Sequence, residues 1–359
     1  MRQGLTLNAM VVINALAMTT VWPDIAKANE AISFDNKIIT MVIGFAAGGG
    51  TDVAGRLVAS HVAKHLPGHP SILVRNVPGA DGMTAMNYVL QQTAPDGTTM
   101  VMGSNSQVDP MNYRKVNAKF DPTTFPIIGG FSSGGSVVLI SKDAEARLFD
   151  KSAAPIVMGS TAALPRAAMQ MTLWGIEYLG WNARWVVGYP GTNDLITALE
   201  RSEVDMTATG NAFQIKKLIE SGKFKILTQS GLFQSGQFAA NDDFGGAPVF
   251  AHQMDGKIND QLAKAAFSYW TSIITAEKWI GLTPKTPAEI VAVYRDVFDK
   301  VSIDKDFLSA SGKIRDDMIP VKYSDMAMLI RNLADTSPEA LNFTTSLMEK
   351  QGLRASQSK

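Results

Sequence analysis

The chain has 359 residues, of which 46 % are apolar and 18 % charged, with 33 basic and 33 acidic side chains. This composition supplies a sizeable core and excludes wholesale disorder, and the length favours two large domains. The balanced charge gives no support to a nucleic-acid partner. The chain contains no cysteine, which excludes disulfides, thiolate metal sites and a cysteine nucleophile.

The N-terminus has the parts of a secretory signal peptide. Arg2 precedes a mostly apolar stretch at residues 5–18, and the small-residue site Ala26-Lys27-Ala28 follows. The apolar stretch is shorter than the about 20 residues that a membrane span needs, so we do not expect it to anchor the mature chain. We therefore expect residues 1–28 to be removed on export and the mature protein to be soluble.

The first third of the chain alternates between strand and helix patterns. Short β-rich apolar runs predict strands, and apolar residues at helical spacing predict helices. The predicted strands are 38–45, 71–74 and 99–102, and the predicted helices are 52–66 and 84–92. Strand, loop and helix in succession imply parallel pairing and an α/β layer architecture.

The same alternation continues through the middle of the chain. The predicted strands are 156–158, 184–187, 204–207 and 225–228, with a helix at 194–200 and others after the first and third of these strands. Residues 269–274 form a further β-rich run, and residues 284–299 predict a helix capped by Thr286-Pro287-Ala288-Glu289. Two α/β lobes fit this succession better than one continuous sheet.

Candidate ligand-binding residues lie where predicted strands end. Ligands of open α/β sheets bind beyond the carboxyl ends of the strands, where helix starts present N–H groups that suit an anion. The loop at residues 46–51 has this form, with Gly48-Gly49-Gly50 and a capping candidate in Thr51 or Asp52. A triple glycine alone is explained equally well by a tight turn without a ligand. Three further strand ends repeat the small polar chemistry: Ser104-Asn105-Ser106, Ser160-Thr161 and Tyr189-Pro190-Gly191-Thr192.

Nucleotide and hydrolase motifs are missing from the sequence. Gly50 is followed by Thr51-Asp52 rather than by the Lys-Ser/Thr pair that ends a P-loop. Val53 stands where a dinucleotide fingerprint needs its third glycine. The sequence also lacks the Gly-x-Ser-x-Gly elbow of α/β-hydrolases.

Other polar and aromatic residues favour structural roles. His61 and His65 have the i, i+4 spacing of a metal pair, but both fall within the apolar arc of their helix, so we interpret them as partly buried or boundary residues. Asp205 has no acid–base partner nearby in sequence, and we interpret it as structural. The tryptophans at positions 174, 181 and 185 are not accompanied by the stripe of basic residues that a base-stacking surface would have. We expect them to pack between helices and strands.

Four motifs in order resemble those of the tripartite tricarboxylate transporter substrate-binding (Bug-type) receptors. They are Phe45-Ala46-Ala47-Gly48-Gly49-Gly50-Thr51-Asp52, Ala54-Gly55-Arg56-Leu57, Asn76-x-Pro78-Gly79-Ala80-x-Gly82 and Ala94-Pro95-Asp96-Gly97-Thr98. The similarity is densest over residues 38–106 and continues more weakly to residue 290. The motifs are specific as an ordered set, whereas each alone is not.

The resemblance implies an α/β fold with the two-lobed, type II-like architecture of a periplasmic binding protein, a Venus flytrap with its ligand cleft between the lobes. Residues 36–138 and 269–355 would form the first lobe and residues 139–268 the second, with two crossings between them. The implied function is that of a monomeric, non-catalytic receptor in the periplasm. It would capture a small organic acid without cofactor or metal and deliver it to the membrane permease subunits of a tripartite transporter.

The resemblance also implies which residues contact the ligand, through backbone N–H groups, hydroxyls and ordered water. They are Phe45, Ala46, Ala47, Gly48, Gly49, Gly50, Thr51, Asp52, Ser104, Asn105, Ser106, Ser160, Thr161, Tyr189, Gly191 and Thr192. The chain departs from the family at Ala47, where proline is usual, and at Pro190, where lysine is frequent. Both departures touch the implied site, so the ligand can differ from the acids in the family name.

Two other functions stay open from the residues themselves. An α/β enzyme acting on a phosphorylated or carboxylated metabolite would use the same glycine loop, with Asp52 and Asp205 as its acid–base groups. A sensor module would bind the same ligand and report it to a signalling partner.

Overall fold

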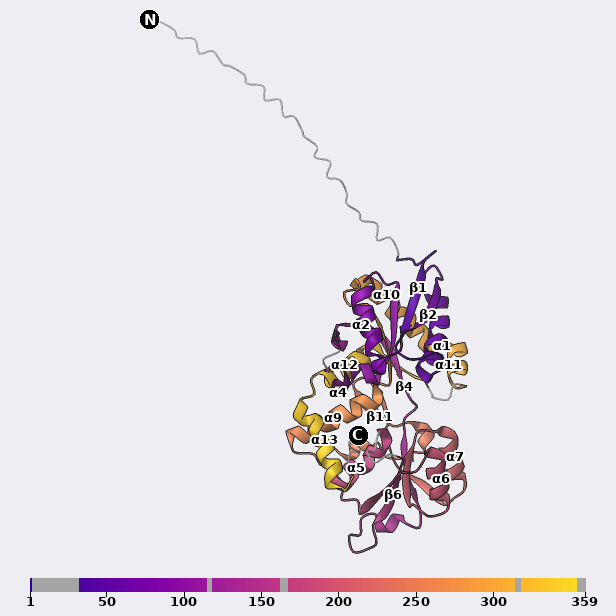
Figure 1. Ribbon diagram of the computed structural model, residues 1–359, viewed down its shortest axis with the longest axis vertical. Coiled ribbons are helices and arrows are strands. Elements are labelled where there is room, and N and C mark those ends of the chain that lie inside the picture. The colour runs from indigo at the N-terminus through magenta and orange to yellow at the C-terminus, as the bar shows by residue number, and fades with distance from the viewer. Residues whose placement is uncertain (2–31, 115–117, 162–166, 314–317, 354–359) are drawn as a thin grey trace. The chain divides into compact units, whose positions relative to one another are not determined.

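The computed structural model describes residue 1 and residues 32–114, 118–161, 167–313 and 318–353 (Figure 1). Residues 1–32 form one unit and residues 33–359 another, and every helix and strand named below belongs to the second. The predicted signal peptide, residues 1–28, lies outside the described residues apart from Met1. Within the described residues, no helix has both the length and the apolar character needed to cross a membrane.

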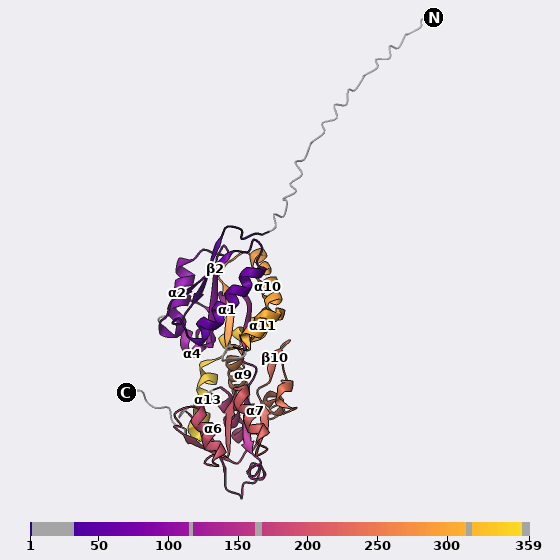
Figure 2. The same ribbon diagram turned by 90° about the vertical axis from the view of Figure 1, so that its right-hand side faces the viewer.

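Six of the described strands form a mixed sheet, called here the first sheet. Its order is β13 (Ile319–Lys322), β4 (Ile127–Ser132), β12 (Lys278–Leu282), β3 (Thr99–Ser104), β1 (Ile38–Ile43) and β2 (Ser71–Asn76). β1 pairs in parallel with β2 and β3, whereas β12 runs antiparallel to both β3 and β4. Helix α1 (Gly50–His65) lies beside α10 (Ala288–Ile303) and α11 (Lys305–Ser311) in Figures 1 and 2. The first sheet and the helices on it therefore combine an early segment of the chain with a late one.

Five of the described strands form the second sheet, which comes from the middle of the chain. Its order is β7 (Ala183–Val187), β6 (Ile156–Ser160), β8 (Met206–Thr209), β5 (Val137–Ser141) and β9 (Phe224–Gln229). β6 is parallel to β7 and β8, and β5 is antiparallel to β8 and β9. Each sheet thus contains three neighbouring parallel strands, β2-β1-β3 in the first and β7-β6-β8 in the second. In each, the strand that comes first in the sequence lies in the middle, and an antiparallel strand, β12 or β5, pairs with the third.

The remaining elements connect these strands. The other α-helices are α2 (Met83–Gln92), α3 (Asn105–Val108), α4 (Pro110–Tyr113), α5 (Gln170–Tyr178), α6 (Thr192–Glu200), α7 (Ala212–Glu220), α8 (Phe250–Gln253), α9 (Gln261–Thr275), α12 (Tyr323–Ala334) and α13 (Pro338–Lys350). Short 3₁₀ helices are η1 (Ala80–Gly82), η2 (Pro122–Thr124), η3 (Glu145–Arg147), η4 (Ala167–Met169) and η5 (Asp242–Phe244), and β10 (Leu232–Gln234) and β11 (Gln237–Ala239) form a hairpin.

The predicted elements of residues 38–102 and 156–228 are confirmed, with ends that shift by a few residues. The predicted parallel pairing is right for β1, β2 and β3 and for β6, β7 and β8, but it is wrong for the strands beyond them. β12 and β5 do not arrive through a crossover helix from a neighbouring strand. A crossover helix makes the two strands that it connects parallel, and without one β12 and β5 can run antiparallel to their neighbours.

The strand-like run at residues 269–274 is in fact the end of helix α9. Ala263, Ala266 and Trp270 are buried at spacings of three and four, so the helical period of the whole segment overrides its local β-rich composition. The helix at 284–299 is present as α10, but Thr286 does not cap it. Its hydroxyl donates instead to the carbonyl of Thr283, at 2.7 Å.

Helix α9 belongs to two apolar clusters. Its residues Ala263, Ala266 and Trp270 pack with β5, β6 and α13 in the cluster of the second sheet, where Trp174 and Trp181 are fully buried as expected. Its residue Tyr269 packs with β3, β12 and α12 in the cluster of the first sheet. The two sheets therefore share one helix between their cores.

The histidine interpretation is confirmed by the packing of α1. His61 is buried, its Nδ1 lies 3.0 Å from the carbonyl of Leu57, and its ring meets the edge of Phe307. His65 is half-buried, with Nε2 3.1 Å from Oδ2 of Asp304. This bond lowers the pKa of Asp304 to about 2.

Gly103 offers a test of the packing where β3 ends. A Cβ atom at this position would lie 2.2 Å from Cε2 of Trp279, whose ring is fully buried and whose Nε1 donates to the carbonyl of Ser104 at 3.0 Å. We expect Gly103→Ala to lower the free energy of unfolding by about 1–3 kcal/mol, because a rigid ring must move. Urea unfolding measures the change. Gly312→Ala is the control, since its Cβ would meet nothing closer than 3.6 Å, and equal stability of the two variants would contradict the expectation.

Candidate functional site

The first sheet brings two of the predicted ligand loops to one edge. In the parallel pairing of β1 with its neighbours, Ile43 lies opposite both Asn76 and Met102, so β1 and β2 end together and β3 ends two residues further along the same edge. Residues 45–52 follow β1 and lead into α1, and residues 103–106 span the end of β3 and the start of α3. The strand order reverses between these two strands, which is the switch point where open α/β sheets bind ligands.

The loop after β1 is held by the carboxylate of Asp52, which is 2 % exposed. Its Oδ2 accepts from the N–H of Gly48 and from Nε of Arg56, both at 2.9 Å, and its Oδ1 accepts from Nδ2 of Asn76 at 2.8 Å. The expected capping role is therefore wrong in detail: Gly49 is the N-cap of α1 and makes no side-chain bond. Asp52 instead draws the loop back against the helix, where Gly48 adopts a φ of +82° that suits glycine.

These bonds also set the charge state of Asp52. Burial alone would raise its pKa, but the hydrogen bonds from Arg56, Gly48 and Asn76 outweigh burial and hold the pKa below the usual 3.8. Asp52 and Arg56 are opposite charges in contact, so together they add little net charge to the loop.

The loop after β3 is fixed by a capping box. The hydroxyl of Ser104 accepts from the N–H of Ser106 at 3.3 Å, and Oε1 of Gln107 accepts from the N–H of Ser104 at 2.6 Å. Nε2 of the fully buried Gln107 donates to the carbonyl of Asp81, which joins this loop to the turn before α2. Sequence reasoning missed Gln107, although its position three residues after Ser104 is the signature of a capping box.

The second sheet brings the other two predicted loops together. Ser160 ends β6, and its carbonyl accepts from the N–H groups of Gly188 and Tyr189, at 3.1 and 3.4 Å. Gly191 is the N-cap of α6, and Thr192 is its first residue. Ser160-Thr161 and the loop Tyr189–Thr192 are therefore neighbours at one edge.

The switch point of the second sheet lies between β6 and β8, and it points to a loop that sequence reasoning did not select. The segment after β8, Thr209-Gly210-Asn211, leads into α7. The hydroxyl of Thr209 donates to Oε1 of Gln214 at 2.9 Å, and Oδ1 of Asn211 caps α7 by accepting from the N–H of Gln214 at 3.0 Å. Nε2 of Gln214 reaches Oδ1 of Asn193 in α6 at 2.9 Å. The same criterion that selected the other loops, small polar residues at the end of a predicted strand, would also have selected this one.

One short segment touches both edges. Residues 133–136 connect β4 to β5, and the N–H of Ser133 donates to Oε2 of Glu277 at 2.8 Å. The carbonyl of Glu277 accepts from the N–H of Asn105 at 3.0 Å, which ties this segment to the loop after β3. At the other end, a Cβ on Gly210 would lie 3.2 Å from the carbonyl oxygen of Gly135. The two switch-point loops therefore flank the same connection.

Asp205 is structural, as interpreted from the sequence. Its Oδ1 accepts from Nη2 of Arg147 at 2.8 Å, and its Oδ2 accepts from the N–H of Val157 at 2.9 Å. Among the residues that the structure describes, no group of three or more His, Asp or Glu side chains could hold a metal ion.

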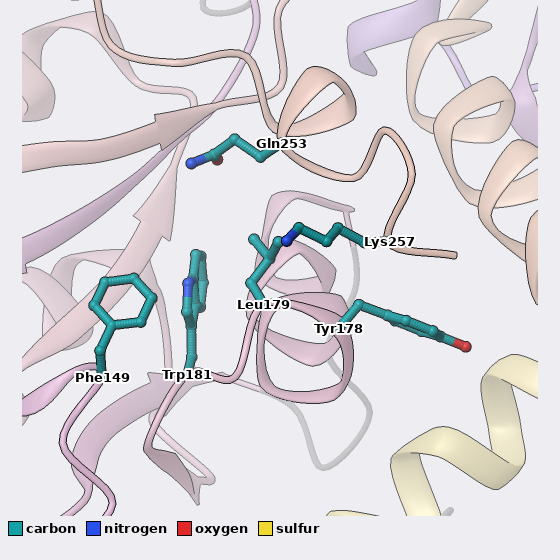
Figure 3. A pocket seen from close by; sticks show the side chains of 6 residues that line it. All are labelled: Phe149, Tyr178, Leu179, Trp181, Gln253 and Lys257. Atoms are coloured by element: carbon teal, nitrogen blue, oxygen red, sulfur yellow. The ribbon is translucent and has the colours of Figure 1, made fainter. Parts of the chain in front are cut away.

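Two surface depressions lie elsewhere on the chain. One is lined by Phe149, Tyr178, Leu179, Trp181, Gln253 and Lys257, and Figure 3 shows the Tyr178 hydroxyl directed away from Trp181. The other lies along α8 and α9, with Met254 and Phe267 among its lining residues. None of the predicted ligand residues lines either depression.

Comparisons with known proteins bear on the fold and the family. No family model matches the chain. It is 29 % identical over 227 residues to a UPF0065 protein of Bordetella pertussis, a Bug-family protein, covering 61 % of this chain and 67 % of that protein. It is 42 % identical over 71 residues to a UPF0065 protein of Cupriavidus necator, covering 20 % of this chain and 21 % of that one.

The structural comparison covers more of the chain. A crystal structure of a TctC solute-binding protein from Polaromonas matches 89 % of this chain and 100 % of its own, with a TM-score of 0.64 and 18 % sequence identity. The expected two-lobed α/β fold class is confirmed, and so is the resemblance to the Bug-type receptors. The individual ligand contacts stay predictions.

Asp52→Asn tests the loop after β1. The change removes the charge and one acceptor oxygen, so at least one of three donors loses its partner, and we expect the free energy of unfolding at neutral pH to fall by about 1–3 kcal/mol. A carboxyl whose pKa is lowered on folding stabilises the native state above its unfolded pKa, here 3.8, and that contribution is lost as the pH falls below this value. The variant should therefore lose less stability than the parent on acidification.

Denaturant unfolding at several pH values measures both effects. Asp255→Asn, at an exposed carboxyl, is the matched control and should leave the stability near that of the parent. If Asp52→Asn matches the parent in both stability and acid sensitivity, the loop is not held by this carboxylate.

Proposed function

We propose that this chain is an extracytoplasmic solute-binding receptor that captures a small carboxylate between the switch-point loops of its two sheets, with no bond made or broken. The observation that carries the proposal is the connection at residues 133–136. It bonds to Glu277, which is bonded to the loop after β3, and it passes close to Gly210 in the loop after β8. A ligand held there would be gripped by both halves of the molecule. Such shared contacts favour a closed state over an open one.

The donors at the first edge suit an anion. The first helical bond of α1 runs from the N–H of Val53 to the carbonyl of Gly49, so the N–H groups of Gly50, Thr51 and Asp52 precede the helical ladder. Ala46, Ala47 and the three glycines are exposed and leave the backbone accessible. The positive end of the α1 dipole adds to the attraction of a carboxylate.

At the second edge we extend the proposed contacts. Ser160, Thr161, Tyr189, Gly191 and Thr192 are retained. Thr209, Gly210 and Asn211 are added, because they follow the strand on the other side of the switch point.

The two carboxylates on which an enzyme would depend are both engaged in structural bonds. Asp52 holds three donors of its own loop and neighbouring strand, and Asp205 holds Arg147 and a strand N–H. This occupation supports a non-catalytic role over acid–base chemistry by these groups.

The remaining parts of the proposal concern the lobes and the cell. We keep a discontinuous first lobe and a central second lobe, but we assign α13 to the second lobe because its apolar residues pack in the cluster of the second sheet. We place the first crossing at residues 133–136 because β5 pairs within the second sheet. The predicted export signal at residues 1–28 and the family resemblance support a periplasmic receptor that delivers its ligand to a tripartite permease. The expected monomeric state stays part of the proposal. A sensor role would use the same site and differ only in the partner.

Thermal unfolding with organic acids tests ligand capture. A ligand that binds only the native state stabilises it by RT ln(1 + [L]/Kd), about 2.7 kcal/mol at 100 Kd, so the melting temperature should rise with concentration for at least one acid. The panel is succinate, glutarate, citrate and acetate, with isothermal titration to confirm one-to-one binding. No shift with any acid of the panel would contradict the receptor proposal, and turnover of one of them would favour an enzyme instead.

Asn211→Asp tests the added loop. Aspartate caps a helix as well as asparagine does, so the fold should be kept, while the new negative charge opposes a carboxylate at that edge. We expect the affinity for whichever panel acid the parent binds to fall several-fold. Asn36→Asp is the control, because Asn36 is exposed and precedes β1 at the opposite end of the first sheet. Equal loss in both variants would count against the second edge.

A further inference from the structure

Lys278, the first residue of β12, is a buried cation that the motifs do not explain. The residue is only 5 % exposed, and its Nζ lies 2.6 Å from Oε1 of Glu277. Burying an ammonium group is costly unless it is paired, and even a paired ion often contributes little to stability. A role in the stability of the fold is therefore a weak explanation for this lysine.

The strand register places Lys278 at the switch point of the first sheet. In the β12–β3 ladder it lies directly opposite Ser104, the residue at which β3 ends. Directly opposed residues of antiparallel strands project from the same face, with Cβ atoms about 5 Å apart. Lys278 and Ser104 therefore lie on one face, at the edge where the loop Ser104–Ser106 begins.

That face is the one covered by α1. A Cβ on Gly55 of α1 would lie 2.5 Å from Cδ1 of Ile43 and 3.4 Å from Cγ of Met102. Met102 and Ser104 are two residues apart in β3, so their side chains share a face. Lys278 thus shares both face and edge with the start of α1. Arg56, the cation of α1 nearest in sequence to that start, is already paired with Asp52.

Glu277 holds the pair of donors that a bound carboxylate would use. Its Oε1 accepts from the ammonium of Lys278, and its Oε2 accepts from the backbone N–H of Ser133 at 2.8 Å. An ammonium and a main-chain N–H are the usual partners of a ligand carboxylate. The Glu277 side chain is 27 % exposed, so solutes can approach it.

We infer that Lys278 is the cation of the carboxylate site and that Glu277 is an internal carboxylate competing with the ligand for it. This inference rests on the proposed receptor function and adds the source of charge selectivity. The site would prefer acids with at least two carboxylates. One would replace Glu277 as the partner of Lys278, and another would accept from the N–H groups at the second edge.

The test compares charge removal from each member of the pair. Binding of succinate and of citrate is measured by isothermal titration at low and at physiological ionic strength. Lys278→Met should weaken the binding of the panel acid that the parent holds by about 10- to 100-fold, the loss of one charge-assisted bond. Glu277→Gln should instead tighten it, because the competing charge is gone. Lys300→Met, at an exposed lysine paired with Asp296, is the matched control and should change neither.

The opposite signs distinguish a binding role from a structural one. If both variants weaken binding equally, the pair only supports the fold, and the inference fails. If the parent binds an acid and Lys278→Met binds it equally well, the inference fails while the receptor function stands. If the parent binds neither succinate nor citrate and none of the other panel acids shifts its melting temperature, the receptor function itself fails and the inference with it.

A second variant distinguishes a loss of binding from a loss of the fold. Lys278→Met leaves Glu277 without its cation, whereas the double variant Glu277→Gln/Lys278→Met removes both charges of the pair. Circular dichroism and the melting temperature check the fold of each. The double variant should bind more weakly than Glu277→Gln alone, and equal affinity of these two would overturn the assignment of Lys278.

Discussion

The short connection between β4 and β5 is the constraint on which the site depends. Five residue steps separate Ser132 from Val137, and an extended chain covers at most about 18 Å in five steps. β3 and β4 are both antiparallel to β12, so they end at the same edge, about 10 Å apart. Val137 lies opposite Thr209 at the end of β8. The carboxyl edges of the two sheets must therefore stay near each other, whatever angle the sheets adopt.

The charges near the first of these edges are largely balanced among themselves. Asp52 pairs with Arg56, and Glu277 pairs with Lys278. The field at the loops then comes mainly from oriented N–H groups at helix starts, which favour an anion, while the proposed ligand cation Lys278 is shared with Glu277. Such an arrangement suits a receptor that must release its ligand, because internal carboxylates are ready to replace the one that leaves.

The sequence patterns correctly predicted those elements whose formation depends on residues close together in the chain. The strands at 38–45 and 99–102, the glycine loop and the helix after it are encoded by apolar runs and turn residues within a few positions of one another, and all are present. The pairing of β12 with β3 and β4 joins segments about 150 residues or more apart, so no local pattern contains it. The Glu277–Lys278 pair could not be placed at the site without that register. The role of Thr209-Gly210-Asn211 likewise depends on strand order, which the sequence does not state directly.

The expected two crossings between lobes understate how the halves are joined. After β9 the chain forms the hairpin β10–β11, whose Phe233 and Phe238 pack into the cluster of the first sheet. At its tip the N–H groups of Ser235 and Gly236 donate to the buried carboxylate of Asp325 in α12, at 2.9 and 3.1 Å. Since α9 also contributes to both cores, any hinge closure has to keep the hairpin and one part of α9 with the first sheet. Movement is then confined to the segments between these anchors and the second sheet, among them residues 133–136, which border the proposed ligand.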